Sequence, residues 1–250
     1  MTVLLTNDDG IDSTGLEALQ AALSVDHDVW TIAPDGERSA MSHYITLRDP
    51  IRCRKIAEQV YSSSGSPADC VIVGTLGGLP VTPDVVVSGI NIGPNFGTDI
   101  IYSGTVAAAR QAAFMGIPGI AVSINAHSAP FYLDPIANFV TEHLEDFRQL
   151  WNPRHLININ APNLELTDPP VRVTFPSWRI YEDRVERFDS PRGDTYYFLN
   201  GRPLEGPLEE GSDWHAVSEG AVSVSPIYLN PVDHHENEAY RDALFLKSGV

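Results

Sequence analysis

Over the first 160 or so residues, stretches with the apolar pattern of a strand alternate with stretches that have the pattern of a helix. Short apolar runs with the length of buried strands occur at residues 3–6, 28–33, 84–88, 120–123 and 156–160. Apolar residues recur at helical spacing, or follow helix-start residues, at residues 15–23, 67–76, 104–115 and 135–150. Strands separated by helices imply crossover connections, so the chain is predicted to fold as an α/β protein around a parallel sheet.

Two parts of the chain follow a different pattern. Shorter strands are predicted at residues 45–47, 51–54 and 59–62. Beyond Pro162 the chain is rich in proline, glycine and charge, with alternating runs at residues 171–174, 196–199 and 221–225. We expect hairpins that project from the main sheet toward a partner subunit, and a short helix at residues 237–246. Residues 1–162 are therefore predicted to form the core, and 163–250 a hairpin and tail region that is not an independent domain.

Composition narrows the function classes. The net charge of −17 argues against a groove for a nucleic-acid polymer, which requires positive charge. Cys53 and Cys70 lack the spacing of a zinc motif or a disulfide framework, and this favours a reducing compartment. No apolar run reaches the roughly 18–20 residues of a membrane span, and a core strand already begins at residue 3. We expect a cytoplasmic protein with no membrane partner.

Two adjacent acids, Asp8 and Asp9, directly follow the first apolar run. Neighbouring carboxylates at the end of a buried strand repel each other and resist desolvation unless a cation holds them. Ligands bind at the carboxyl end of strands in open α/β sheets, and Gly10 permits a sharp turn there. The motif predicts a site for a divalent cation, although one Asp capping the next helix is an alternative interpretation.

Three further polar loops follow predicted strands. One leads from Asp35 to Ser39, one begins at Asn91 and contains Asn95, and one is the helix start at residues 103–105. In a parallel sheet all of them open at the same edge as the acids. Carboxylate, hydroxyl and amide oxygens suit Mg²⁺ or Mn²⁺, or Ca²⁺, better than zinc.

The helix start at Ser103, Gly104 and Thr105 offers free backbone N–H groups and two hydroxyls, which suit a phosphate. The alternative is an ordinary N-cap. The helix dipole contributes only about 0.3–1 kcal/mol per charge. The helix can therefore position a phosphate, whereas its cleavage requires a metal ion.

These motifs together carry a resemblance. The chain resembles the SurE family of survival-protein nucleotidases over residues 3 to about 226. The matching stretches are 4–11, 33–35 with 38–39, 66–71, 88–91 with 93 and 95, and 102–106. Weaker matches are 158–162 and 212–217. The resemblance implies a metal-dependent phosphatase that hydrolyses nucleoside 5′- and 3′-monophosphates by metal-activated water. It also implies a Rossmann-like three-layer catalytic core, with hairpin and tail segments exchanged between the subunits of a homodimer or homotetramer.

The resemblance also assigns residues. One divalent metal ion per subunit, Mg²⁺ or Mn²⁺, is expected on Asp8, Asp9, Ser39 and Asn91, with Asp8 and Asp9 as the catalytic residues. The phosphate is expected to lie at Asn95, Ser103, Gly104 and Thr105. Residues 40–43 are bulkier than the family pattern, which bears on loop mobility or substrate choice.

Several alternatives stay open. Polyphosphate or another phosphomonoester can be the main substrate, and the chain can instead be a non-catalytic nucleotide or metal sensor. Arg38 can bind phosphate or form a surface ion pair, and His43 can act as an acid or base or be incidental. P-loop, dinucleotide-binding, serine-hydrolase and zinc-peptidase motifs are absent from the sequence. Base preference and 5′ versus 3′ preference are left open.

Overall fold

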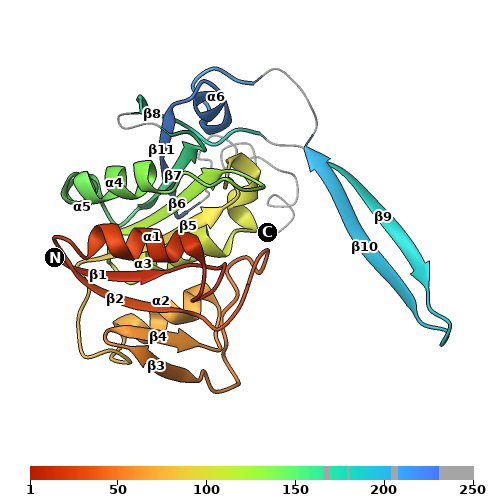
Figure 1. Ribbon diagram of the computed structural model, residues 1–250, viewed down its shortest axis with the longest axis horizontal. Helices are drawn as coiled ribbons and strands as arrows, with labels where there is room; N and C mark the ends of the chain where they lie inside the picture. Colours follow the sequence, from red (N-terminus) through yellow and green to blue (C-terminus); the bar gives the residue numbers. More distant parts are fainter. Residues whose placement is uncertain (166–168, 179–180, 204–207, 231–250) are drawn as a thin grey trace, which may run out of the picture.

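The computed structural model describes residues 1–165, 169–178, 181–203 and 208–230. This part of the chain folds around a nine-stranded sheet with the order β3-β4-β2-β1-β5-β6-β7-β11-β8 (Figure 1). The strands are β1 (Thr2–Thr6), β2 (Asp28–Pro34), β3 (Cys53–Ala57), β4 (Val60–Ser63), β5 (Val85–Ile92), β6 (Gly119–Asn125), β7 (His155–Pro162), β8 (Val171–Val173) and β11 (Val222–Tyr228).

The middle of this sheet is parallel, which confirms the predicted fold class. The strands from β4 through β2, β1, β5 and β6 to β7 all pair in parallel. Antiparallel pairs occur toward the two sides, where β3 pairs with β4 and β11 pairs with β7. The carboxyl ends of the parallel strands therefore share one edge, and the predicted site loops follow β1, β2 and β5.

Helices cover both faces of the sheet and complete three layers. One face carries α1 (Thr14–Leu23), α4 (Asp134–Glu142) and α5 (Leu144–Leu150), and the other carries α2 (Pro67–Thr75) and α3 (Gly104–Phe114). Both faces of the sheet are apolar and need a cover, because successive side chains of a strand such as β1 point to opposite faces. Val3 and Leu5 join the first cluster, Leu4 joins the second, and all three are fully buried.

Serine residues fix the starts of three helices. Ser13, Ser66 and Ser103 are N-caps whose hydroxyl oxygens accept a backbone N–H from the first turn of α1, α2 and α3. Ser66 and Asp69 form the reciprocal capping box. The predicted beginnings of these helices are confirmed to within one residue.

Two local predictions are wrong. The helix predicted at residues 135–150 is divided at His143 into α4 and α5. The strand predicted at residues 45–47 does not form, because the backbone N–H of Thr46 donates to the carboxylate of Asp69 at 2.9 Å instead of to a neighbouring strand.

The largest difference concerns the residues after Pro162. Runs predicted as projecting hairpins, 171–174 and 221–225, instead form β8 and β11 and extend the main sheet. The main sheet therefore continues beyond β7 with two further strands. The segment that does project is the hairpin of β9 (Tyr181–Asp189) and β10 (Thr195–Pro203) (Figure 1). A short helix, α6 (Asp213–Ser218), was not expected from the sequence, and the helix predicted at 237–246 lies outside the described residues.

Both cysteines are free thiols in different surroundings. Cys53 is exposed on β3, whereas Cys70 on α2 is fully buried and burial raises its pKa to about 12. Among the described residues, no helix combines the length and apolar character needed to cross a membrane.

Candidate metal centre

Four loops meet where β1 ends. The backbone N–H of Arg38, in the loop after β2, donates to the carbonyl oxygen of Asp8 at 2.7 Å. The backbone N–H of Ile92 donates to Oδ2 of Asp9 at 3.3 Å, and the hydroxyl of Thr105 donates to Oδ1 of Asp8. These contacts place the loop of Ser39, the end of β5 and the start of α3 against the two acids.

The turn after β1 is held by the buried side chain of Asn7. Its Nδ2 donates to the carbonyl of Gly10 at 2.9 Å and to Oγ of Ser13 at 2.7 Å, while the N–H of Gly10 donates back to its Oδ1 at 3.2 Å. Gly10 has φ of +103°, and a methyl group there would lie 3.0 Å from the backbone of Gly36. Glycine at this position lets the two loops approach.

Asp8 is buried, with 4% of its surface exposed, at the start of α3. Burial raises the pKa of its carboxyl group, and hydrogen bonds from the Thr105 hydroxyl and from the amides of Thr105 and Gly104 oppose that rise. A methyl group at position 104 would lie 2.8 Å from Cβ of Asp8, so only glycine allows this approach. The helix start therefore supports a carboxylate of the chain itself.

Asp9 is half-buried beside it. Burial, the charge of Asp8 and the charge of Glu37 raise the pKa of Asp9 to about 6, and the amide of Ile92 partly opposes the shift. In the part of the chain that the structure describes, no lysine or arginine forms an ion pair with either acid. Two crowded carboxylates without a cationic partner are the electrostatic setting that a divalent cation neutralises.

Ser39 and Asn91 flank the acids with different environments. Ser39 is exposed and its hydroxyl donates to Oε1 of Glu37 at 2.9 Å. Nδ2 of Asn91 donates to the carbonyl of Gly93 at 2.7 Å, so the amide oxygen is the side-chain atom that a cation could approach. The described residues contain no cluster of three His, Cys, Asp or Glu side chains suited to a metal. Coordination of a cation by Ser39 and Asn91 stays a prediction.

The predicted phosphate-binding residues lie at the same edge. Ser103 caps α3, with its Oγ accepting from the N–H of Val106 at 3.1 Å, so the ordinary N-cap interpretation is correct for its hydroxyl. Thr105 is fully buried against Asp8. Contact of Ser103, Gly104 and Thr105 with a phosphate stays a prediction.

Asn95 is held in a buried polar network. Its N–H donates to Oδ1 of Asn160 at 2.8 Å, and its Nδ2 donates to Oγ of Ser123 at 2.7 Å. Its carbonyl accepts from Nδ2 of Asn158 at 2.9 Å and of Asn160 at 3.1 Å. Sequence reasoning gave neither asparagine of β7 a role, nor Glu37; two asparagines alternating within an apolar strand were the available clue.

Arg38 and His43, the two other residues considered for the site, bond to side chains that are not among the predicted metal or phosphate ligands. The guanidinium of Arg38 pairs with Asp35 at 2.7 Å, and Asp35 also pairs with Arg52 at 3.0 Å. Nε2 of His43 lies 2.9 Å from Oε1 of Gln111. Arg38 is thus in an ion pair, and His43 contacts α3.

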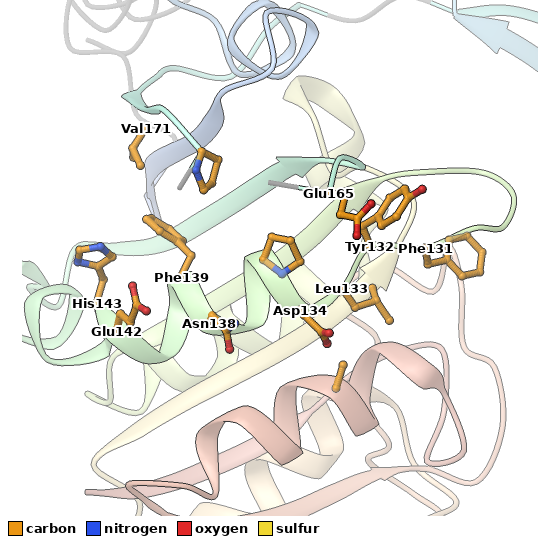
Figure 2. A pocket seen from close by; sticks show the side chains of 13 residues that line it. Phe131, Tyr132, Leu133, Asp134, Asn138, Phe139, Glu142, His143, Glu165 and Val171 are labelled. Carbon is orange, nitrogen blue, oxygen red and sulfur yellow. The ribbon is translucent and has the colours of Figure 1, made fainter. Parts of the chain in front are cut away.

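A separate hollow of about 490 Å³ lies along α4 (Figure 2). Asp134 and Asn138 point toward α1, while Phe139 lies on the side of α4 that faces Val171 (Figure 2). None of the predicted site residues lines this hollow, so it is distinct from the candidate metal centre.

The fold and the acidic edge define a Rossmann-like α/β protein with an oxygen-rich site at the carboxyl ends of its parallel strands. The chain belongs to the survival protein SurE family, whose model matches residues 3–183.

Individual relatives match almost the full chain. It is 42% identical over 238 residues to "5′-nucleotidase SurE" of Geotalea daltonii, covering 94% of this chain and 96% of the relative. It is 41% identical over 233 residues to the protein of the same name from Thermosipho melanesiensis, covering 91% of each. The SurE protein structure from Aquifex aeolicus aligns with a TM-score of 0.85 and 34% identity, covering 99% of this chain and 100% of that one.

Proposed function

We propose that this chain is a metal-dependent phosphatase that hydrolyses nucleoside 5′- and 3′-monophosphates. Membership of a family whose relatives are named 5′-nucleotidase supports the activity. The observation that carries the metal dependence is the pair Asp8 and Asp9, two crowded acids with raised pKa values and no ion-pair partner among the described residues.

Asp8, Asp9, Ser39 and Asn91 would hold one divalent cation, Mg²⁺ or Mn²⁺, in each subunit. Their carboxylate, hydroxyl and amide oxygens are the ligand types that these ions prefer. When bound, the ion supplies positive charge for the phosphoryl oxygens and a water molecule of lowered pKa.

The remaining steps fall to the side chains around it. The start of α3 and Asn95 would position the phosphate, with Ser103, Gly104 and Thr105 as its predicted neighbours. Asp9 is the proton acceptor that we assign, because its half-buried carboxylate lies beside the position where the ion would hold the water. The hydrogen bond from the Thr105 hydroxyl opposes the rise that burial causes in the pKa of Asp8.

The hairpin of β9 and β10 is proposed to contact a second copy of the chain, giving a homodimer or homotetramer. It projects from the body (Figure 1) and exposes a row of large apolar side chains. These residues are Val185, Phe188, Tyr196, Tyr197, Phe198 and Leu199. We assign the region 163–250 to the exchange of segments between subunits.

The protein is proposed to be cytoplasmic, which the two free thiols support.

The test is phosphate release from 5′-AMP, 3′-AMP and tripolyphosphate, with Mn²⁺, with Mg²⁺ and with EDTA. Metal-dependent release from the nucleotides is expected, and Asp8→Asn should abolish it. Faster release from tripolyphosphate than from either nucleotide would make polyphosphate the main substrate. Nucleotide binding without release from any substrate would instead favour a sensor.

A further inference from the structure

The loop between β5 and α3 is fastened to a part of the chain more than 70 residues away. This loop contains Asn95 and the short 3-10 helix η1 (Gly97–Ile101), and it leads directly into Ser103 at the start of α3. Its Asn95 end is held by the asparagines of β7. Its η1 end is held by Tyr181 and Asp213, neither of which has a role in the nucleotidase site proposed above.

Asp213 is the centre of that second attachment. It is fully buried at the start of α6, and its carboxylate accepts three backbone N–H groups. Oδ2 accepts from Gly97 at 2.7 Å, whereas Oδ1 accepts from Ser177 at 2.9 Å and from Trp214 at 2.7 Å. A buried carboxylate is stable in this setting because several N–H donors replace its hydration.

The surrounding contacts leave little freedom between the segments. A methyl group on Gly97, whose φ is +48°, would lie 1.8 Å from the carbonyl oxygen of Ser177. The rings of Phe96 and Trp214 stack with their centroids 6.5 Å apart. The loop thus lies close to the backbone at Ser177 and stacks its Phe96 ring on the Trp214 ring of α6.

The hairpin reaches the same loop. Tyr181, the first residue of β9, places its hydroxyl 2.7 Å from each carboxylate oxygen of Asp99 within η1. A movement at the base of the hairpin therefore changes a contact of η1 directly.

We propose that Asp213 is a positioning residue that fixes η1, and through it the start of α3, in the geometry that accepts the substrate phosphate. The inference rests on the proposed nucleotidase function and adds a residue outside the predicted metal shell. Tyr181 acts on the same loop and connects it to the hairpin. The N–H groups of Gly97, Ser177 and Trp214 that bond to Asp213 do not belong to any of the predicted metal ligands, so cation binding should depend on Asp213 less than phosphate binding does.

Asp213→Asn tests this role selectively. Asparagine keeps the shape and one acceptor oxygen, which can serve Ser177 and Trp214, but its NH₂ group faces the N–H of Gly97. We expect the KM for 5′-AMP and the dissociation constant for inorganic phosphate to rise about tenfold, the effect of losing one charge-assisted hydrogen bond. The kcat at saturation should change by less than about threefold. The affinity for Mn²⁺ should change less than the affinity for phosphate.

Thr174→Val is the matched control. Thr174 is buried in the same region, and its hydroxyl bonds to Ser223 and Ser225 at 2.7 and 2.6 Å without reaching the loop. This variant should lower the unfolding temperature but leave phosphate binding unchanged. Tyr181→Phe keeps the ring and should raise the KM in the same direction by a smaller factor.

Phosphate binding measured by calorimetry with Mn²⁺ present, together with turnover, distinguishes a failure of the proposed function from a failure of the positioning role. Wild-type protein that releases no phosphate from any substrate would overturn the proposed function. Wild-type turnover with unchanged KM and phosphate affinity in Asp213→Asn would overturn the positioning role alone. Equal losses in Asp213→Asn and Thr174→Val would also overturn it. If Asp213→Asn does not fold, an unchanged KM in Tyr181→Phe counts against the role.

Discussion

The hydroxyl of Thr105 donates a hydrogen bond to Oδ1 of Asp8, joining the second residue of α3 to the first acid after β1. The two residues are 97 positions apart in the sequence. Both are buried, so the bond acts in an environment where it is not replaced by water. The pairing of strands β1 and β5 in the sheet brings the two residues together, and the bond opposes the rise that burial causes in the pKa of the acid.

Removing the negative charge of Asp8 should abolish turnover. Asp8→Asn keeps the size of the side chain but lacks the negative charge for a cation. We expect phosphate release from 5′-AMP to fall by at least about 100-fold, more than the loss of a supporting partner of a metal ligand causes. Circular dichroism should show an unchanged fold. Asp12→Asn, an exposed acid of the same turn, is the control and should retain full activity.

Removing the donor should have a graded effect. Thr105→Val eliminates the hydrogen bond that opposes the rise in the pKa of Asp8, so this carboxyl should hold its proton at higher pH. The acidic limb of the pH–rate profile should move to higher pH, with a loss of about 10- to 100-fold at neutral pH. Thr105→Ser restores the hydroxyl and should recover most of the activity. A flat response to both substitutions would show that the bond does not matter for turnover.

The pKa of Asp9 predicts a pH-dependent stability in EDTA. Its folded value of about 6 lies above the ordinary 3.8, so the folded state retains a proton that the unfolded state releases. The contribution of Asp9 to stability therefore falls as the pH rises from 3.8 to about 6 and is most unfavourable at neutral pH. Urea unfolding should show Asp9→Asn to be more stable than wild type at pH 7.5, with a smaller gap at pH 4.5. The opposite order of gaps would contradict a raised pKa.

An acid placed on the apolar row of the hairpin should weaken subunit association. Leu199 is 88% exposed, and burying a leucine at an interface contributes about 1.5–3 kcal/mol. Leu199→Glu should therefore shift the oligomer toward smaller species in size-exclusion chromatography with light scattering. Arg192→Glu adds an acid at the exposed hairpin turn and should leave the assembly intact. A monomeric wild type would remove the basis for this prediction.

Much of the core follows from local rules that the sequence displays. The apolar runs of β1 and β5 and the serine caps of α1 and α3 are local features, and the structure has them in the predicted places. Residues 221–225 show the limit of such rules. Alternation identifies a strand there, but the choice between a hairpin and β7 as partner depends on long-range pairing.

The candidate site likewise contains residues that the sequence reveals and contacts that only the structure shows. Asp8 and Asp9 were recognisable because two charges at a strand end are unusual in a buried setting. The role of Thr105 toward Asp8 was not, since a helix-start hydroxyl can cap its own helix, bind a ligand or bind a distant side chain. Asp213 lies 116 residues from Gly97, and no local pattern marks that contact.

The two cysteines make the chain a reporter of its own unfolding. Cys53 lies on the surface of β3, while Cys70 is buried on the side of α2 that packs against the sheet, with a thiol pKa of about 12. Thiolates are the species that react with alkylating and disulfide reagents, so at neutral pH the native protein should count as one thiol and the unfolded chain as two. The rate at which the second thiol reacts then measures how often the α2 side of the sheet opens, without any label or engineered residue.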